Sequence, residues 1–150
     1  MSSTTDTSKL DDLIVTTIDS IRGYEHSAEH ADAGRYAGFF SEMAADRRQM
    51  LAQLQDASRA LGGTPSAYGS TAATIHRRWE DLRRVLGGGD EALVKEVERG
   101  EDYLKEEFER AMNDENVSAG TRAVMQAAFE SVRRGHDRAR ALKQELAAAD

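Results

Sequence analysis

The sequence has no cysteine, which excludes disulfides, thiolate metal sites and cysteine nucleophiles and is compatible with a reducing compartment. It has a single proline, Pro65, and few strand signals, so we expect helices nearly throughout. No apolar run is long enough to cross a bilayer, and the first residues lack the basic and apolar regions of a signal peptide. These absences predict a cytoplasmic, all-α protein of single-domain length with no membrane partner.

Positive charge is also in short supply. The chain has 20 Lys and Arg against 27 Asp and Glu, a net charge of -7. Because phosphate binding needs a surplus of cations, this balance argues against nucleic acid as a partner. Four arginines between residues 76 and 84 scatter around one predicted helix and are interrupted by acidic residues, so we interpret them as a solvated face.

Glycine-rich breaks divide the chain into four long segments and one short one. In each long segment apolar residues recur at alternating steps of four and three, which places them along one face of a helix. These seams run over residues 10–31, 36–61, 93–112 and 121–146. Four amphipathic helices of this length predict a four-helix bundle, with a disordered tail over residues 1–8 and the bundle domain over residues 9–150.

The short segment lies between the second and third long helices. Ser70 can cap it, and Ile75, Trp79, Leu82 and Leu86 have the spacing of a short amphipathic helix. A long connection with its own helix suits a crossover that runs the length of the bundle. Exposed apolar surface on this helix, around Trp79, would favour self-association or a protein partner.

The octapeptide "GYEHSAEH", residues 23–30, places two histidines four residues apart, as in some metal sites. At about 100° per residue, His26 and His30 each lie about 160° from the seam, which predicts that they face solvent. Glu25 and Glu29 lie about 60° and about 100° from it, at or beside the buried stripe.

Charged residues interrupt the other seams as well. Arg47 lies in the middle of the second seam and Glu101 in the third. The candidate residues for a buried polar cluster are Glu25, Glu29, Arg47, Glu98, Glu101 and His136. A buried charge must be paired or must coordinate a ligand, and this cluster could meet that demand in more than one way.

The chain resembles a bacterial family of unknown function within the ferritin-like superfamily. The matching motifs are Gly23-Tyr24, Ala28-Glu29, Arg47, Leu54, Gly62-Gly63, Gly69-Ser70, His76-Arg77-Arg78-Trp79, Glu98-Arg99-Gly100-Glu101-Asp102 and His136-Asp137. The resemblance implies a ferritin-like bundle and an association with bacterial stress. Metal-binding members of that superfamily hold two irons with carboxylates from two helices and a Glu-x-x-His pair from each of the other two.

No glutamate of this sequence has a histidine three residues later. Arg47 stands where the second helix would carry such a pair, and its fixed charge would repel a metal ion. We therefore expect a non-enzymatic protein without a cofactor, in which Arg47 joins Glu25 or Glu29 to Glu101. A homodimer is the expected form.

Two alternatives stay open. The first is an iron- or manganese-binding oxidase or storage protein with an atypical site of Glu29, Glu98, Glu101 and His136. The second is a bundle in which Arg47 extends to the surface.

Overall fold

The computed structural model describes residues 3–30, 34–70 and 90–149. These residues form four helices, α1 (Ser3–His30), α2 (Gly34–Ala60), α4 (Asp90–Met112) and α5 (Ala119–Ala149), and no strand occurs among them. The all-α bundle predicted from the seams is therefore confirmed. The predicted crossover helix falls within residues 71–89 and lies outside the described residues.

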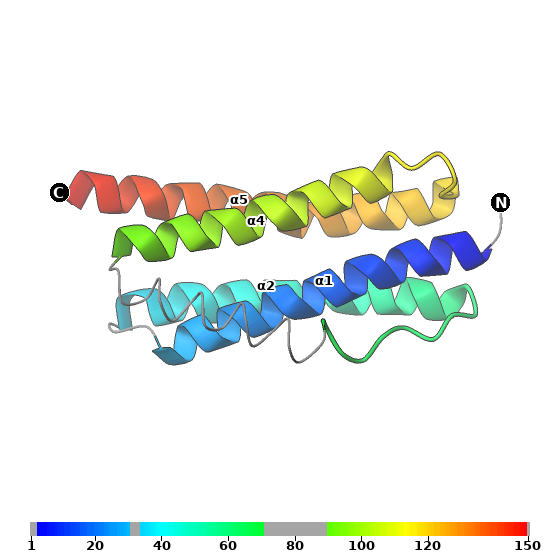
Figure 1. Cartoon of the computed structure of the whole chain (residues 1–150), viewed down its shortest axis with the longest axis horizontal. Coiled ribbons are helices and arrows are strands. Elements are labelled where there is room, and N and C mark those ends of the chain that lie inside the picture. The colour runs from blue at the N-terminus through cyan, green and yellow to red at the C-terminus, as the bar shows by residue number, and fades with distance from the viewer. Residues whose placement is uncertain (1–2, 31–33, 71–89, 150) are drawn as a thin grey trace.

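The helices pair as two antiparallel hairpins, α1 with α2 and α4 with α5 (Figure 1). Helices α2 and α4 start at the same end of the bundle and run in the same direction. Of the connection between them, residues 61–70 are described. Contacts of α2 with α5, and of α1 with α4, hold the two hairpins together.

The core has two regions, one toward each end of the bundle. The first, which we call the apolar region, lies where α1 and α5 begin; its members include Leu10, Leu13, Ile14, Ile18, Met50, Leu54, Leu104, Phe108, Met125, Ala128 and Val132. The second, the aromatic region, comprises Tyr24, Tyr36, Phe40, Met43, Ala44, Val94, Val97, Ala139 and Leu142. On α2, α4 and α5 the residues between the two regions include Arg47, Glu101 and Gly135, so polar groups occupy the middle of the bundle.

The amino-terminal residues differ from the prediction. Residues 3–8, expected in a disordered tail, form the first turns of α1, and Asp6 is buried. Its carboxylate accepts hydrogen bonds from the Ser118 backbone N–H (2.9 Å), the Ser118 hydroxyl (2.6 Å) and the Thr121 hydroxyl (3.0 Å). Burial alone would raise the pKa of Asp6, but these hydrogen bonds outweigh it and hold the pKa below the ordinary value. The seam pattern missed this anchor because a lone aspartate carries no periodic signal.

Residues 61–70, which we call the strap, leave the end of α2 and run beside α1 (Figure 1). Gly62 turns the chain with a φ of 83°, a conformation that favours glycine. Two serines of the strap donate hydrogen bonds to carboxylates of α1: Ser66 to Asp11, and Ser70 to Asp19. None of the described helices combines the length and the hydrophobicity that a membrane span requires.

Candidate functional site

Arg47 and Glu101 form a fully buried ion pair in the middle of the bundle. Arg47 is 0% exposed and Glu101 is 2% exposed. The Nη2 group of Arg47 donates to both carboxylate oxygens of Glu101, at 2.9 and 2.7 Å, and its Nη1 group donates to the Ser20 hydroxyl at 3.3 Å. Charge-assisted hydrogen bonds of this kind offset the large cost of removing two charges from water.

Tyr24 of α1 completes the coordination of the Glu101 carboxylate. Its hydroxyl donates a hydrogen bond to Oε1 of Glu101, and its ring centre lies 6.0 Å from the guanidinium carbon of Arg47. Burial, and then the negative charge of Glu101, raise the pKa of Tyr24 well above its ordinary value of 10.0. The hydroxyl therefore stays protonated and acts as a permanent donor.

Gly135 of α5 provides the room for this arrangement. A Cβ atom at position 135 would lie 2.7 Å from Cε of Met43 and 2.9 Å from Oε2 of Glu101, and closer still to Nη2 of Arg47. Glycine lets the α5 backbone approach the ion pair directly. All four described helices thus contribute to one cluster, which we call the polar centre: Ser20, Tyr24, Arg47, Glu101 and Gly135.

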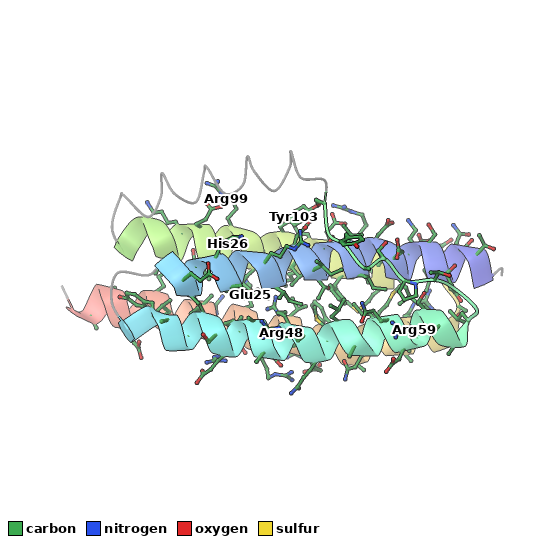
Figure 2. All side chains as sticks on the ribbon, turned by 90° about the horizontal axis from the view of Figure 1, so that it is seen from below. Glu25, His26, Arg48, Arg59, Arg99 and Tyr103 are labelled. Carbon is green, nitrogen blue, oxygen red and sulfur yellow. The ribbon has the colours of Figure 1, made fainter. Side chains whose placement is uncertain are left out.

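The structure contains the expected pair of Arg47 and Glu101. The residue of α1 that contacts this pair through the Glu101 carboxylate is Tyr24. Glu25 and Glu29, the expected partners, are both exposed. The Glu25 carboxylate pairs at the surface with Nη2 of Arg48 at 2.8 Å (Figure 2). Neither glutamate belongs to the polar centre.

The reason lies in a drift of the buried face along α1. Beyond its middle, the buried residues follow each other in steps of three: Ile18, Ile21, Tyr24 and Ser27. On a helix with about 3.6 residues per turn, each such step turns the buried face back by about 60°. The face therefore moves away from Glu25 and Glu29, which a seam of strict four and three steps had kept near it.

Glu98 and His136 also lie outside the polar centre. Glu98 is partly buried and pairs with Nζ of Lys143 at 3.3 Å, and Nε2 of His136 lies 3.0 Å from a carboxylate oxygen of Asp102. His26, expected to face solvent, is partly buried, and the side chain of His30 lies outside the described residues. Of the four candidate metal ligands, Glu98 and His136 therefore lie in two separate pairs, Glu29 is exposed, and Glu101 alone belongs to the polar centre.

The residues present do not fit a metal centre of the ferritin type. Within the part of the chain that the structure describes, no three His, Asp or Glu side chains converge as metal ligands. The oxygens of Glu101 face the guanidinium of Arg47, so a cation already occupies the position that a metal ion would need. The Glu101 carboxylate is therefore neutralised by Arg47 and does not offer an open coordination site.

A groove of about 350 Å³ separates α1 from α4 beside the polar centre. Tyr24, Glu101 and Ser20 form part of its wall, together with Asp19 and with apolar residues of α4 that include Val97 and Leu104. Tyr103 and Arg99 on α4 also border it (Figure 2). The groove is thus a concave surface of the described chain that the members of the polar centre on α1 and α4 approach.

Three residues of the polar centre, Ser20, Tyr24 and Gly135, were not proposed from the sequence as site residues. Tyr24 was assigned to the seam, where a tyrosine is an ordinary core residue, although its hydroxyl needed a partner. Gly135 occupied a seam position as one of several small residues. The signal in the sequence for Tyr24 and Gly135 was the arginine in the seam of the second helix. A large buried cation requires space, which Gly135 leaves, and a polar environment, to which Tyr24 contributes.

The comparisons with known proteins identify a family and no function. The profile of a family described as "Domain of unknown function (DUF2383)" matches residues 6–114. That range covers α1, α2 and α4, and with them Tyr24, Arg47 and Glu101. No curated protein and no solved structure matches the chain. Because the matched residues make up most of its length, the chain belongs to the DUF2383 family.

Proposed function

We propose that this protein is a non-enzymatic helical bundle of the ferritin-like type, in which the Arg47–Glu101 pair takes the place of a metal centre. The observation that carries the proposal is the polar centre, where the buried Glu101 carboxylate accepts two hydrogen bonds from the buried Arg47 guanidinium and one from Tyr24. Nε of Arg47 has no hydrogen-bond partner in the described part of the chain. Such a centre would fix the relative register of the four described helices.

The chemistry of the polar centre supports a structural role. An arginine does not release its proton in proteins, and the raised pKa of Tyr24 keeps its hydroxyl protonated. Both oxygens of Glu101 accept hydrogen bonds from these two residues. A general acid or base needs a pKa near the working pH, and the raised pKa of Tyr24 places its hydroxyl outside that range.

The experiment is a metal-loading series on protein without an affinity tag. The protein is loaded in turn with Fe(II), Mn(II) and Zn(II), and bound metal per chain is measured together with thermal stability. We expect less than stoichiometric metal and no rise in the melting temperature. The matched variants are Glu101→Ala and His136→Ala, with His26→Ala as the control.

The metal alternative makes the opposite prediction. Stoichiometric iron or manganese that is lost in Glu101→Ala and His136→Ala, but kept in His26→Ala, would overturn the proposal. A metal lost only in His26→Ala would identify a surface site and leave the structural role of the polar centre intact.

We also propose that the bundle acts through self-association, as a homodimer, or through a protein partner in the cytoplasm of a bacterium under stress. The bacterial setting and the stress association rest on the family resemblance. Light scattering coupled to size-exclusion chromatography tests the homodimer, which a monomeric mass over a range of concentrations would exclude.

A further inference from the structure

One donor of the polar centre lacks a partner among the described residues. Nε of Arg47 is buried and unpaired there, although the same guanidinium donates to Glu101 through Nη2 and to Ser20 through Nη1. A buried donor without an acceptor pays the full desolvation cost of its group, and the cost is larger on a charged group. Buried donors in native proteins are therefore nearly always satisfied, either by the protein or by ordered water.

Glu101 has acceptor capacity to spare close to this donor. Its Oε1 accepts hydrogen bonds from Nη2 of Arg47 and from the Tyr24 hydroxyl. Its Oε2 accepts from Nη2 at 2.7 Å and, within the described part of the chain, from no other side chain. A carboxylate oxygen has two lone pairs, so Oε2 can accept a second hydrogen bond. Because Nε and Nη2 belong to one rigid guanidinium, a single small molecule can reach both Nε and Oε2.

The packing around the ion pair limits the size of such a molecule. Arg47, Glu101 and Met43 are all buried. A Cβ atom on Gly135 would lie 2.9 Å from Oε2 of Glu101 and 2.7 Å from Cε of Met43. The α5 backbone and Met43 therefore already fill the side of the pair that faces α5, and a ligand of many atoms would have to displace them.

The charge of the polar centre defines the molecule further. The positive charge of Arg47 and the negative charge of Glu101 cancel, and burial raises the pKa of Tyr24, so its hydroxyl stays neutral. An anion at Nε would leave a net negative charge in the bundle, and a cation would face the guanidinium. Both are costly in a buried environment. A neutral molecule that accepts from Nε and donates to Oε2 avoids both costs.

The α1–α4 groove gives solvent a route to this position. Ser20, Tyr24 and Glu101 all contribute to its wall, and the Ser20 hydroxyl accepts a hydrogen bond from Nη1 of Arg47 at 3.3 Å. Among the described residues, Arg47 is not part of the wall. A molecule bound at Nε therefore lies behind the wall and is separated from the solvent that fills the groove.

We propose that the polar centre binds one internal water molecule, which accepts a hydrogen bond from Nε of Arg47 and donates one to Oε2 of Glu101. The water completes the hydrogen bonds of the buried pair, as internal waters do for polar groups that the protein leaves unpaired. The inference concerns the same polar centre as the proposed function but does not rest on it, because it follows from the unpaired Nε alone.

Oxygen-17 magnetic relaxation dispersion of water tests the proposal in solution, because its amplitude counts internal waters that exchange slowly with the solvent. The wild type is compared with the triple variant Arg47→Met, Glu101→Leu and Tyr24→Phe, which has neither Nε nor Oε2. Tyr24→Phe alone keeps both atoms. The matched control is Arg48→Met at the next position of α2, where the arginine pairs with Glu25 at the surface.

We expect the triple variant to lose the dispersion amplitude of one water molecule. Tyr24→Phe and Arg48→Met should both keep the wild-type amplitude. A high-resolution crystal structure of the wild type locates the water, which should lie about 2.7–3.2 Å from both Nε of Arg47 and Oε2 of Glu101. If the triple variant does not fold, the crystal structure decides alone.

Three results would overturn the proposal. The first is an equal dispersion amplitude in the wild type and a folded triple variant. The second is a crystal structure in which Nε of Arg47 donates to a protein oxygen or has no neighbouring density. The third is an anomalous bromide signal at Nε in crystals grown with bromide, which would identify the ligand as an anion. The structural role of the ion pair is measured separately, by urea unfolding, and can fail without a change in the water count.

Discussion

The apolar region and the polar centre hold the same four described helices together by different means. In the apolar region, residues such as Leu13, Leu54 and Phe108 are buried among other hydrocarbon groups, and any close-packed arrangement of similar volume would satisfy them. In the polar centre, Arg47 pairs with one buried carboxylate, and a shift of a single residue would separate it from Glu101. The first region supplies the bulk of the driving force for folding, while the second selects one register of the helices.

The largest expected effect comes from breaking the buried ion pair. Arg47→Met leaves the Glu101 carboxylate buried without its cation, and we expect a loss of about 3–5 kcal/mol in the free energy of unfolding. Combining Arg47→Met with Glu101→Leu and Tyr24→Phe makes the polar centre as apolar as its neighbour and should restore most of this loss. Urea unfolding measures both; a triple variant no more stable than Arg47→Met would mean that the loss comes from packing and not from the stranded charge.

Removing the Tyr24 hydroxyl should cause the next largest loss in the free energy of unfolding. Tyr24→Phe keeps the ring but removes one hydrogen bond to a charged acceptor, so we expect a loss of about 1.5–3 kcal/mol. Because the folded-state pKa of Tyr24 is raised, its contribution is complete below pH of about 10 and declines above it, as the unfolded tyrosine ionises. Unfolding curves from pH 8 to 11 should show a decline for the wild type that is weaker in Tyr24→Phe. Parallel declines in the two proteins would contradict the buried hydrogen bond.

Gly135→Ala tests the space around the ion pair. The added methyl group would meet Met43, Glu101 and Arg47, and overpacking of this kind costs about 1–3 kcal/mol. The matched control is Gly38→Ala on α2, where a Cβ atom meets nothing within 4 Å. There the better helix propensity of alanine should stabilise the protein by up to about 1 kcal/mol. Thermal unfolding of the two variants should therefore shift in opposite directions, and a shift in the same direction would remove the special role of Gly135.

The smallest effect is expected in the apolar region. Leu54→Met conserves volume among hydrocarbon neighbours and should cost less than about 1.5 kcal/mol. Arg47→Lys, an equally modest change in the polar centre, should cost more, because an ammonium cannot reproduce the donor geometry of a guanidinium. Equal losses in the two variants, measured by urea unfolding, would show that the two regions do not differ in the way described above.

The sequence was sufficient to predict the buried positions of Arg47 and Glu101, because both interrupt otherwise apolar seams of long helices. It was not sufficient to find their partner on α1. Periodicity assumes a fixed phase, and the drift of the buried face beyond Ile18 turned Glu25 and Glu29 outward. Tyr24 was expected in the seam, but periodicity does not say which group its hydroxyl bonds to.

The role of Gly135 depends on side chains from two other helices, α2 and α4, which no local pattern contains. The hydrogen bonds that the carboxylates of Asp6, Asp11 and Asp19 accept from remote serines were missed for a similar reason. Each joins α1 to a segment remote in sequence, and a single carboxylate on a charged helix surface resembles any other. The predicted crossover helix falls within residues 71–89, outside the described residues.

The hydrogen bonds of Asp6 have a consequence for how the chain assembles. Asp6 finds its partner in Ser118, 112 positions further along the sequence, and Arg47 finds Glu101 54 positions further along. As the polypeptide emerges from the ribosome, α1 and α2 can pair early, but this hairpin then lacks the Glu101 carboxylate that pairs with Arg47 and the Ser118 and Thr121 groups that donate to Asp6. The first half of the chain therefore cannot complete its own buried polar contacts. Glu101 and Ser118 must both be synthesised before Arg47 and Asp6 have the partners that they contact in the complete chain.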